Sequence, residues 1–170
     1  MDEPTSSTSS SAHANYESTT FAFTVTVEAP RERAFEVFVG RIDEWWPRPY
    51  RLGEGERVAL WIEPRVGGVW RERTSDGAEC NWGRVLAWEP PSRLVLSWEI
   101  PVDLSPNPDP DRASRVEVEF AESGTSQTTV RLVHSEFQKH GEGWESVRAM
   151  VTEEAGWPGI LKTYAALASR

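Results

Sequence analysis

The feature that most limits how this chain can fold is its load of nine tryptophans in 170 residues. Each indole brings a large apolar area, and its N–H needs a partner when it is buried. Two of the tryptophans form a doublet, Trp45-Trp46, directly before Pro47. The other seven lie in or beside segments with strand or helix patterns: Trp61, Trp70, Trp82, Trp88, Trp98, Trp144 and Trp157. Such a chain builds either a strongly aromatic core or a cavity with aromatic walls.

The charge balance and the cysteine count exclude several classes of partner and site. The chain has 18 Lys and Arg against 27 Asp and Glu, a net charge of −9. Nucleic acids and anionic membrane surfaces attract basic faces, so neither partner is expected. Cys80 is the single cysteine, which excludes an internal disulfide and a cysteine-rich metal site. Because no apolar run could span a bilayer and no signal-peptide pattern opens the sequence, we expect a cytoplasmic protein without membrane insertion.

Composition divides the chain into two parts. Residues 1–19 are rich in Ser and Thr and contain almost no apolar side chains. Such a segment cannot bury enough surface to offset its ordering entropy, so it is predicted to be a disordered tail. Residues 20–170 are predicted to form one domain, which is long enough to bury a substantial core.

The domain begins with one strand and one helix. Phe21, Phe23, Val25 and Val27 alternate with small or polar residues, the pattern of a half-buried strand. Pro30 is well placed for the first turn of a helix, whose apolar spacing continues to the Trp45-Trp46 doublet. A loop with two prolines and a glycine follows.

Six further strands and a long helix complete the domain. The strand segments are 57–62, 67–74, 79–88, 93–100, 115–120 and 128–134, separated by turn residues. Consecutive strands with short turns indicate an antiparallel sheet. The last 27 residues carry an apolar stripe with helical spacing, and Pro158 should make this helix kink or restart. We therefore predict an α+β fold, in which a curved antiparallel sheet of six to seven strands wraps round the C-terminal helix and leaves a cavity between them.

Several local signatures follow one another along the chain: Ala29-Pro30, Trp45-Trp46-Pro47, Gly67-Gly68, Gly83-Arg84-Val85, Glu89-Pro90-Pro91-Ser92-Arg93-Leu94, Trp98, Thr129–Ser135 and Gly156-Trp157. With the order of the elements, they resemble the START-like (SRPBCC) superfamily. Within it, the chain is most similar to the family named for the activator of the heat-shock protein 90 ATPase, specifically to its C-terminal domain. The resemblance implies a helix-grip fold, like that of the birch-pollen allergen, with a hydrophobic cavity.

The same resemblance leaves the function open, because superfamily relatives include lipid carriers, hormone receptors, polyketide cyclases and co-chaperones. The full co-chaperone has an additional N-terminal domain, in whose place this chain has only the tail. A chaperone partner is therefore not expected.

Four ionisable residues are candidates for chemistry. His134 shares a strand face with Val130 and Leu132, so it is either a general base or ligand partner in the cavity or a histidine satisfied within the core. Arg84, Glu72 and Glu99 could fix a polar ligand group or act as acid and base, or could form an ion pair on the convex face. Arg84 is expected to share the face of Trp82, unless Gly83 marks a β-bulge.

The ligand-binding candidates combine these groups with the aromatic residues expected on the cavity wall. They are Trp46, Trp70, Trp82, Arg84, Trp98, His134, Phe137, Trp157 and Tyr164. For each aromatic residue the alternative is ordinary core packing. No phosphate-binding loop, dinucleotide fingerprint, nucleophile elbow or metal-binding set is found, so no cofactor and no metal is expected.

Three functions remain open. The first is the binding of a small hydrophobic or aromatic molecule in the cavity. The second is a polyketide cyclase or hydratase-like enzyme in the same cavity, which needs an inward-facing ionisable pair, with His134 as the candidate catalytic residue. The third is an interaction module that docks on a partner. A homodimer is left open by the sequence.

Overall fold

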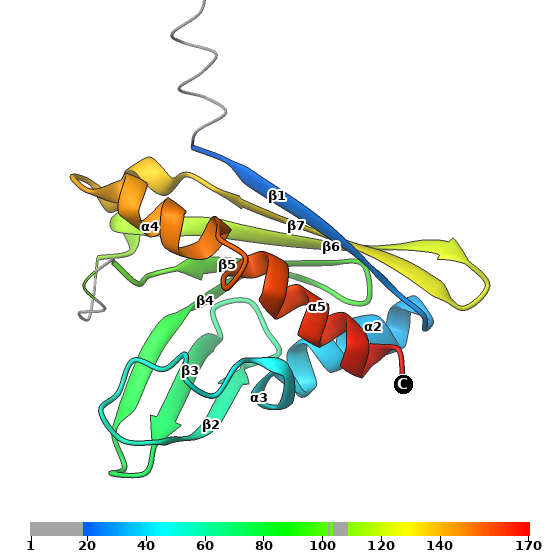
Figure 1. Ribbon diagram of the computed structural model, residues 1–170, viewed down its shortest axis with the longest axis horizontal. Coiled ribbons are helices and arrows are strands. Elements are labelled where there is room, and N and C mark those ends of the chain that lie inside the picture. Colours follow the sequence, from blue (N-terminus) through cyan, green and yellow to red (C-terminus); the bar gives the residue numbers. More distant parts are fainter. Residues whose placement is uncertain (1–18, 102, 104–108) are drawn as a thin grey trace, which may run out of the picture.

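Seven strands form one antiparallel sheet, which confirms the predicted fold class (Figure 1). The computed structural model describes residues 19–101, 103 and 109–170, so the tail predicted for residues 1–19 lies outside the described residues except for Thr19. The order across the sheet is β1-β7-β6-β5-β4-β3-β2. The strands are β1 (Phe21–Val27), β2 (Arg57–Ile62), β3 (Val69–Thr74), β4 (Glu79–Glu89), β5 (Arg93–Trp98), β6 (Ser114–Gly124) and β7 (Gln127–Ser135).

The sheet is strongly curled. In Figure 1, β1, β7 and β6 form a long ribbon, and β2, β3 and β4 turn away from it. Four of the strand pairs contain a register shift, among them β3 with β4 and β4 with β5. Each shift adds local twist to a strand, so together they let the sheet wrap around what lies on its concave face.

The N-terminal helical region is two helices, so the prediction of one helix up to the Trp45-Trp46 doublet was wrong. Helix α2 (Arg31–Gly40) ends before Arg41, whose φ and ψ of −122° and 26° are not helical. The short helix α3 (Ile42–Trp45) then turns the chain in a new direction. The change of axis matters because it sends the two tryptophans of the doublet to different surroundings.

The C-terminal helix restarts, as the proline predicts. Helix α4 (Trp144–Thr152) is followed by a turn, and α5 (Trp157–Ala168) carries Pro158 in its first turn, where its missing N–H costs nothing. Two short 3₁₀ turns, η1 (Pro110–Arg112) and η2 (Phe137–His140), complete the secondary structure of the described residues. None of the helices in the described ranges is long and apolar enough to cross a membrane.

The core lies between the concave face of the sheet and helices α2 and α5. Phe38 of α2 packs edge-on against Phe120 of β6 and against Tyr164 of α5. The Tyr164 hydroxyl donates a hydrogen bond of 2.6 Å to the carbonyl of Ala34, and this bond fixes α5 against α2. Trp45 belongs to the same cluster, and its indole N–H donates to the carbonyl of Val37 at 3.0 Å.

Candidate functional site

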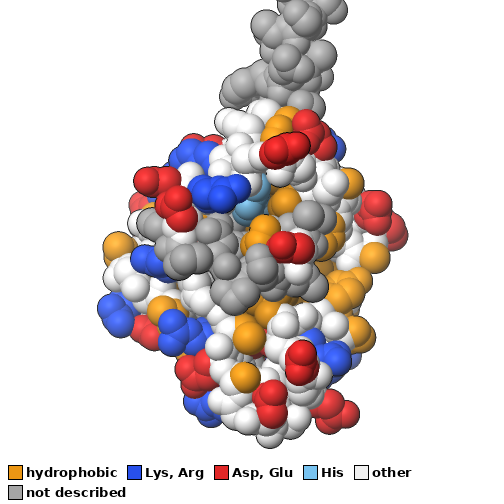
Figure 2. All heavy atoms as spheres, turned by 90° about the vertical axis from the view of Figure 1, so that its left-hand side faces the viewer, with side chains coloured by type: hydrophobic (Ala, Val, Ile, Leu, Met, Phe, Trp, Pro, Cys, Tyr) orange, Lys and Arg blue, Asp and Glu red, His pale blue; other side chains and the backbone are white. Residues whose placement is uncertain are grey.

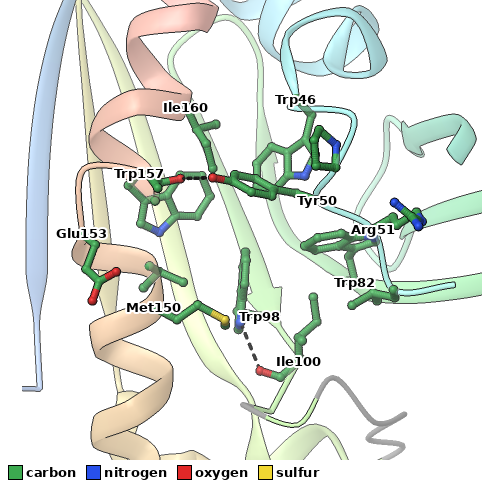
Figure 3. Close-up of a pocket in the computed structure, with 15 residues that line it drawn as sticks. Trp46, Tyr50, Arg51, Trp82, Trp98, Ile100, Met150, Glu153, Trp157 and Ile160 are labelled. Carbon is green, nitrogen blue, oxygen red and sulfur yellow. Dashed lines mark hydrogen bonds between the residues drawn. The ribbon is translucent and has the colours of Figure 1, made fainter. Parts of the chain in front are cut away.

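A pocket with a volume of about 330 Å³ opens where α4, α5, the sheet and the loop after α3 meet. Figure 3 shows Trp157 of α5 on one side, Trp82 and Arg51 on the other, and Tyr50 between them above Trp98. Figure 2 views the end of the molecule that carries α4, and hydrophobic side chains are exposed in its middle. The pocket is lined by Trp46, Pro49, Tyr50, Arg51, Leu52, Trp82, Trp98, Ile100, Met150, Val151, Glu153, Ala155, Gly156, Trp157 and Ile160.

Four of the lining residues form a closed ring of indoles, called here the tryptophan square: Trp46, Trp82, Trp98 and Trp157. Around the square the ring centroids are 5.4, 5.6, 5.7 and 5.6 Å apart, and every pair packs edge to face. This is the arrangement that the quadrupoles of aromatic rings favour. Trp70 does not line the pocket and contacts three members of the square at 5.5 to 5.7 Å. It therefore packs behind the square as core.

Three members of the square are held in orientation by hydrogen bonds from their indole N–H groups. Trp82 donates to a carboxylate oxygen of Glu72 at 2.8 Å. Trp98 donates to the carbonyl of Ile100 at 3.2 Å, and Trp157 donates to Nδ1 of His134 at 3.0 Å. The ring planes of these three residues are thus fixed by hydrogen bonds within the protein.

The pocket loop (residues 46–53) is held by two buried charged side chains on neighbouring strands. The guanidinium of Arg57, on β2, donates to four backbone carbonyls: those of Asp43, Trp46, Pro47 and Tyr50, at 3.3, 2.7, 3.0 and 3.3 Å. Its Nε also lies 3.3 Å from the Asp43 carboxylate. Burial lowers the pKa of Arg57 from its ordinary value, and this carboxylate opposes the shift.

Glu72, on β3, binds backbone N–H groups at the other end of the pocket loop. Its side chain is fully buried and accepts from the backbone N–H of Leu52 at 2.8 Å and of Gly53 at 3.2 Å, besides the Trp82 indole. Glu72 therefore ties two elements of the pocket wall, the loop and β4, to one carboxylate. Hydrogen bonds to a charged acceptor in the interior are the strong ones.

His134 lies behind the pocket wall. It is fully buried, and its ring stacks on Phe137 with the centroids 4.2 Å apart. Because an indole N–H can only donate, Nδ1 is unprotonated and Nε2–H donates to the Ser114 hydroxyl at 2.7 Å. Ser114 in turn donates to Nε2 of His140 at 2.8 Å.

This chain of hydrogen bonds ends at an indole, which does not pass a proton onward, so it orients Trp157. Burial lowers the pKa of His134 well below its ordinary value, and His140 lowers it further. Burial and the nearby Arg112 lower the pKa of His140 to about 4. Both rings are accordingly neutral at neutral pH.

The predicted ligand-binding residues fall into two groups. Trp46, Trp82, Trp98 and Trp157 line the pocket, whereas Trp70, Arg84, His134, Phe137 and Tyr164 do not. Of the second group, all except Arg84 are buried in the core. For Arg84 the structure shows the alternative that the sequence left open, a bulge at Gly83 and an ion pair on the outer face. A register shift beside Gly83 puts Trp82 inside and Arg84 outside, where it lies 3.2 Å from the buried carboxylate of Glu99. The Nδ2 amide of Asn81 donates to the other oxygen of Glu99 at 2.8 Å.

Several residues of the site were not predicted from the sequence. Tyr50 and Met150 line the pocket, and Arg57 fixes its loop. Ser114 is a hydrogen-bond partner of His134, and His140 is bound to Ser114 in turn. The position of Arg57 on the buried face of a short strand is a signal that could have marked it, because an arginine there needs several acceptors. Within the described residues no group of three or more His, Cys, Asp or Glu side chains could hold a metal ion.

Residues 28–168 match the family described as Activator of Hsp90 ATPase homolog 1-like protein. Two solved structures combine a similar fold with substantial identity. The anthrahydroquino-γ-pyrone synthase Txn09, complexed with a molecule named SUM, is 39% identical over 87% of this chain and 96% of its own, with a TM-score of 0.63. The self-sacrificing resistance protein CalC of Micromonospora echinospora is 28% identical over 88% and 93% of the two chains, with a TM-score of 0.64.

Other similarities show the fold alone. Protein NE0264 of Nitrosomonas europaea is 13% identical over 89% of this chain and 95% of its own, with a TM-score of 0.65. No protein of curated function matches the sequence.

Proposed function

The chain belongs to the family of Activator of Hsp90 ATPase homolog 1-like proteins, and on that premise we propose that its pocket binds a flat, polycyclic aromatic small molecule. The observation that carries the proposal is the tryptophan square, four indoles that all line one pocket. A flat aromatic molecule can pack against these rings with the same edge and face preferences that the indoles show among themselves.

The size and chemistry of the pocket support this ligand class. Its volume of about 330 Å³ lies in the range of small-molecule sites, which combine apolar walls with few polar groups. Among the described residues that line it, the ionisable side chains are those of Tyr50, Arg51 and Glu153. A ligand with several charges would leave most of them without a partner.

The name of one similar protein agrees with such a ligand. The synthase is named for an aromatic product, an anthrahydroquinone fused to a γ-pyrone, and it is 39% identical to this chain. Identity at that level over 87% of the chain supports a related ligand class more strongly than fold similarity does.

The test combines extraction with a variant that fills the pocket. Protein purified from its native host is denatured and extracted with organic solvent, and the extract is examined by mass spectrometry for a stoichiometric aromatic compound. Binding of that compound, or of anthraquinone-2-sulfonate as a probe, is then measured by tryptophan quenching. Met150→Trp places a larger ring at the pocket mouth and is expected to weaken binding at least tenfold, a loss of about 1.4 kcal/mol.

The matched control is Ala149→Trp, which adds the same ring at the neighbouring exposed position of α4, outside the pocket lining. It should leave binding unchanged. If neither the extract nor a panel of flat aromatic probes yields a ligand, or if both variants weaken binding equally, the proposal is wrong.

A second candidate function is the closure of a ring on such a molecule. The name of the synthase favours it, but His134 and Glu72 are used inside the core and Arg84 lies on the outer face. An enzyme in this pocket would instead rely on confinement of the substrate and on Tyr50.

The reaction can be tried with an aryl 1,3-diketone that carries an ortho phenol. The phenol oxygen adds to the distal ketone and water leaves, which gives a γ-pyrone. Acceleration over buffer that Met150→Trp abolishes would support catalysis. Binding of this substrate without acceleration would leave the pocket as a carrier.

A further inference from the structure

One buried side-chain donor of a pocket-lining residue has no partner among the described residues. Five aromatic side chains with an N–H or O–H line the pocket, and four of these groups donate to the protein: Tyr50, Trp82, Trp98 and Trp157. The indole N–H of Trp46 is buried and makes no hydrogen bond to any part of the chain that the structure describes. The Trp46 side chain is itself only 3% exposed.

Trp46 cannot easily turn to find a partner. Its backbone N–H donates to the carbonyl of Ile42 at 2.9 Å, and its own carbonyl accepts from Arg57 at 2.7 Å. Its ring lies between those of Trp70, Trp82 and Trp157, with centroids 5.4 to 5.6 Å away. The backbone is therefore fixed and the ring is packed on several sides. A buried donor held in this way is unusual, because nearly all buried polar groups in proteins are satisfied.

We propose that Trp46 Nε1 donates a hydrogen bond to a carbonyl oxygen of the pocket's ligand, an oxygen of the ketone, quinone or pyrone type. This inference rests on the proposed function and adds to it the polar group that the aromatic ligand must carry. The indole donor is neutral, so a neutral acceptor satisfies it without the desolvation that a buried anion would require.

The shape of the acceptor follows from the geometry of the walls. The oxygen of a ring ketone lies in the plane of its ring system and accepts hydrogen bonds near that plane. A flat ligand that stacks on other members of the tryptophan square can therefore turn one edge, with its carbonyl, toward Trp46. Recognition of this oxygen selects quinones and pyrones over hydrocarbons of the same outline.

The experiment uses two probes that differ only in the carbonyls. Anthraquinone-2-sulfonate and anthracene-2-sulfonate share the three-ring outline and the charge, and their dissociation constants are measured with the full chain. The wild-type protein is expected to prefer the quinone by about tenfold, which is the effect of one hydrogen bond near the upper end of the usual range. In Trp46→Phe, which removes the N–H, this ratio should fall to about one.

The control is Trp70→Phe, the same substitution at another buried tryptophan with an unpartnered N–H that does not line the pocket. It should keep the tenfold preference even where absolute affinity changes. A measurement on the wild type guards against misfolded variants: with ¹⁵N-labelled tryptophan, the quinone should move the Trp46 indole resonance downfield and the anthracene probe should not.

The outcomes separate the two proposals. If both probes bind equally well, or if the preference survives in Trp46→Phe, this inference is overturned while aromatic binding stands, and the Trp46 N–H is then directed at the face of a neighbouring indole. If neither probe binds the wild type, the proposed function fails and this inference fails with it.

Discussion

Arg57 and Glu72 hold the pocket loop by binding different backbone groups, and their charge determines which groups each one binds. The guanidinium has only donors and binds the carbonyls of Asp43, Trp46, Pro47 and Tyr50, whereas the carboxylate has only acceptors and binds the N–H groups of Leu52 and Gly53. Five backbone polar groups of a loop without regular structure thereby have charged, buried partners. Its side chains can then line the pocket in one defined arrangement.

Replacing Glu72 with Gln should loosen this arrangement. One oxygen becomes an NH₂ group that faces donors, so at least one of the three N–H bonds is lost. We expect a loss of about 2 kcal/mol in the free energy of unfolding, measured with urea, together with weaker binding of aromatic probes. The control Glu79→Gln, at an exposed residue on the next strand, should change stability by less than about 0.5 kcal/mol. Equal effects of the two changes would contradict this account.

His140 should make stability depend on pH in a defined window. Its folded-state pKa of about 4 lies below the ordinary value of 6.5, so the folded chain resists a proton that the unfolded chain accepts. The contribution of His140 to the free energy of unfolding is complete above pH 6.5 and is lost as the pH falls toward 4. At about 1.4 kcal/mol per pH unit, this amounts to about 3 kcal/mol.

The comparison with His140→Gln tests that contribution, because the carboxylates and His134 titrate in both proteins and the glutamine oxygen can still accept from Ser114. Unfolding free energies measured from pH 7 to 4 should fall more steeply in the wild type. Parallel curves for the two proteins would show that the folded and unfolded states bind protons at His140 equally.

At single positions, the sequence predicts which face of a strand a residue occupies but not what it meets there. Alternation correctly placed His134 on the buried face with Val130 and Leu132. Its partners Ser114 and Trp157 come from β6 and α5, and His140 of η2 binds Ser114 in turn. Nothing in the local pattern specifies those contacts. For the same reason the choice between a catalytic and a core histidine could not be made from residues alone.

At the scale of elements, the bulge in β4 decides which side chains reach the pocket. Trp70 pairs with Gly83 and Arg71 with Asn81, so Trp82 is the extra residue. A β-carbon at Gly83 would lie 1.9 Å from the carbonyl oxygen of Ser97, so only glycine allows β4 and β5 to approach this closely. The glycine thus permits the step that turns Trp82 inward and Arg84 outward.

Gly83→Ala is therefore expected to be strongly destabilising. The overlap is with backbone and cannot be relieved by a side-chain rotation, so we expect a loss of at least about 3 kcal/mol, measured by denaturant unfolding. Gly40→Ala is the control, since a β-carbon there meets nothing within 4 Å and alanine favours the helix. It should match or slightly exceed wild-type stability. If Gly83→Ala left the stability unchanged, β4 and β5 could pair without the close approach that glycine allows at the bulge.

The elements themselves were largely predictable. Alternation and turn residues gave the seven strands in order, and Pro158 marked the restart of the last helix, because these signals are local. The break at Arg41 was missed, because the apolar spacing continues through it from α2 into α3. Strand β6 also runs to Gly124, beyond the predicted end at 120, where pairing with β7 extends the pattern past its apolar part.

At the scale of the whole molecule, the pocket is built from segments that are distant in the chain. The hydroxyl of Tyr50 donates to the carbonyl of Ala155 at 2.7 Å, and this bond joins the pocket loop to the turn between α4 and α5 (Figure 3). The general position of the cavity follows from a curved sheet and a covering helix. The contribution of Tyr50 could not be predicted, since it depends on how two irregular segments meet.

Tyr50→Phe should change the kinetics of the pocket more than the stability of the fold. Tyr50 is partly exposed, so loss of its hydrogen bond should alter the unfolding free energy by less than about 1 kcal/mol. Release of anthraquinone-2-sulfonate, followed by stopped-flow fluorescence, is expected to become about fivefold faster. Thr163→Val removes a comparable hydroxyl bond on the exposed side of α5 and should leave release unchanged. Identical release rates in all three proteins would show that this bond does not restrain the ligand.

The close packing of the indoles also gives the molecule an optical property. Trp46, Trp70, Trp82, Trp98 and Trp157 form a connected set with neighbouring centroids 5.4 to 5.7 Å apart, so excitation absorbed by one ring migrates among all of them before it is emitted. A quencher in contact with any single member therefore reduces the fluorescence emission of the whole set, including that of Trp70, which it does not contact. The tryptophan fluorescence of the protein therefore reports whether its pocket is occupied.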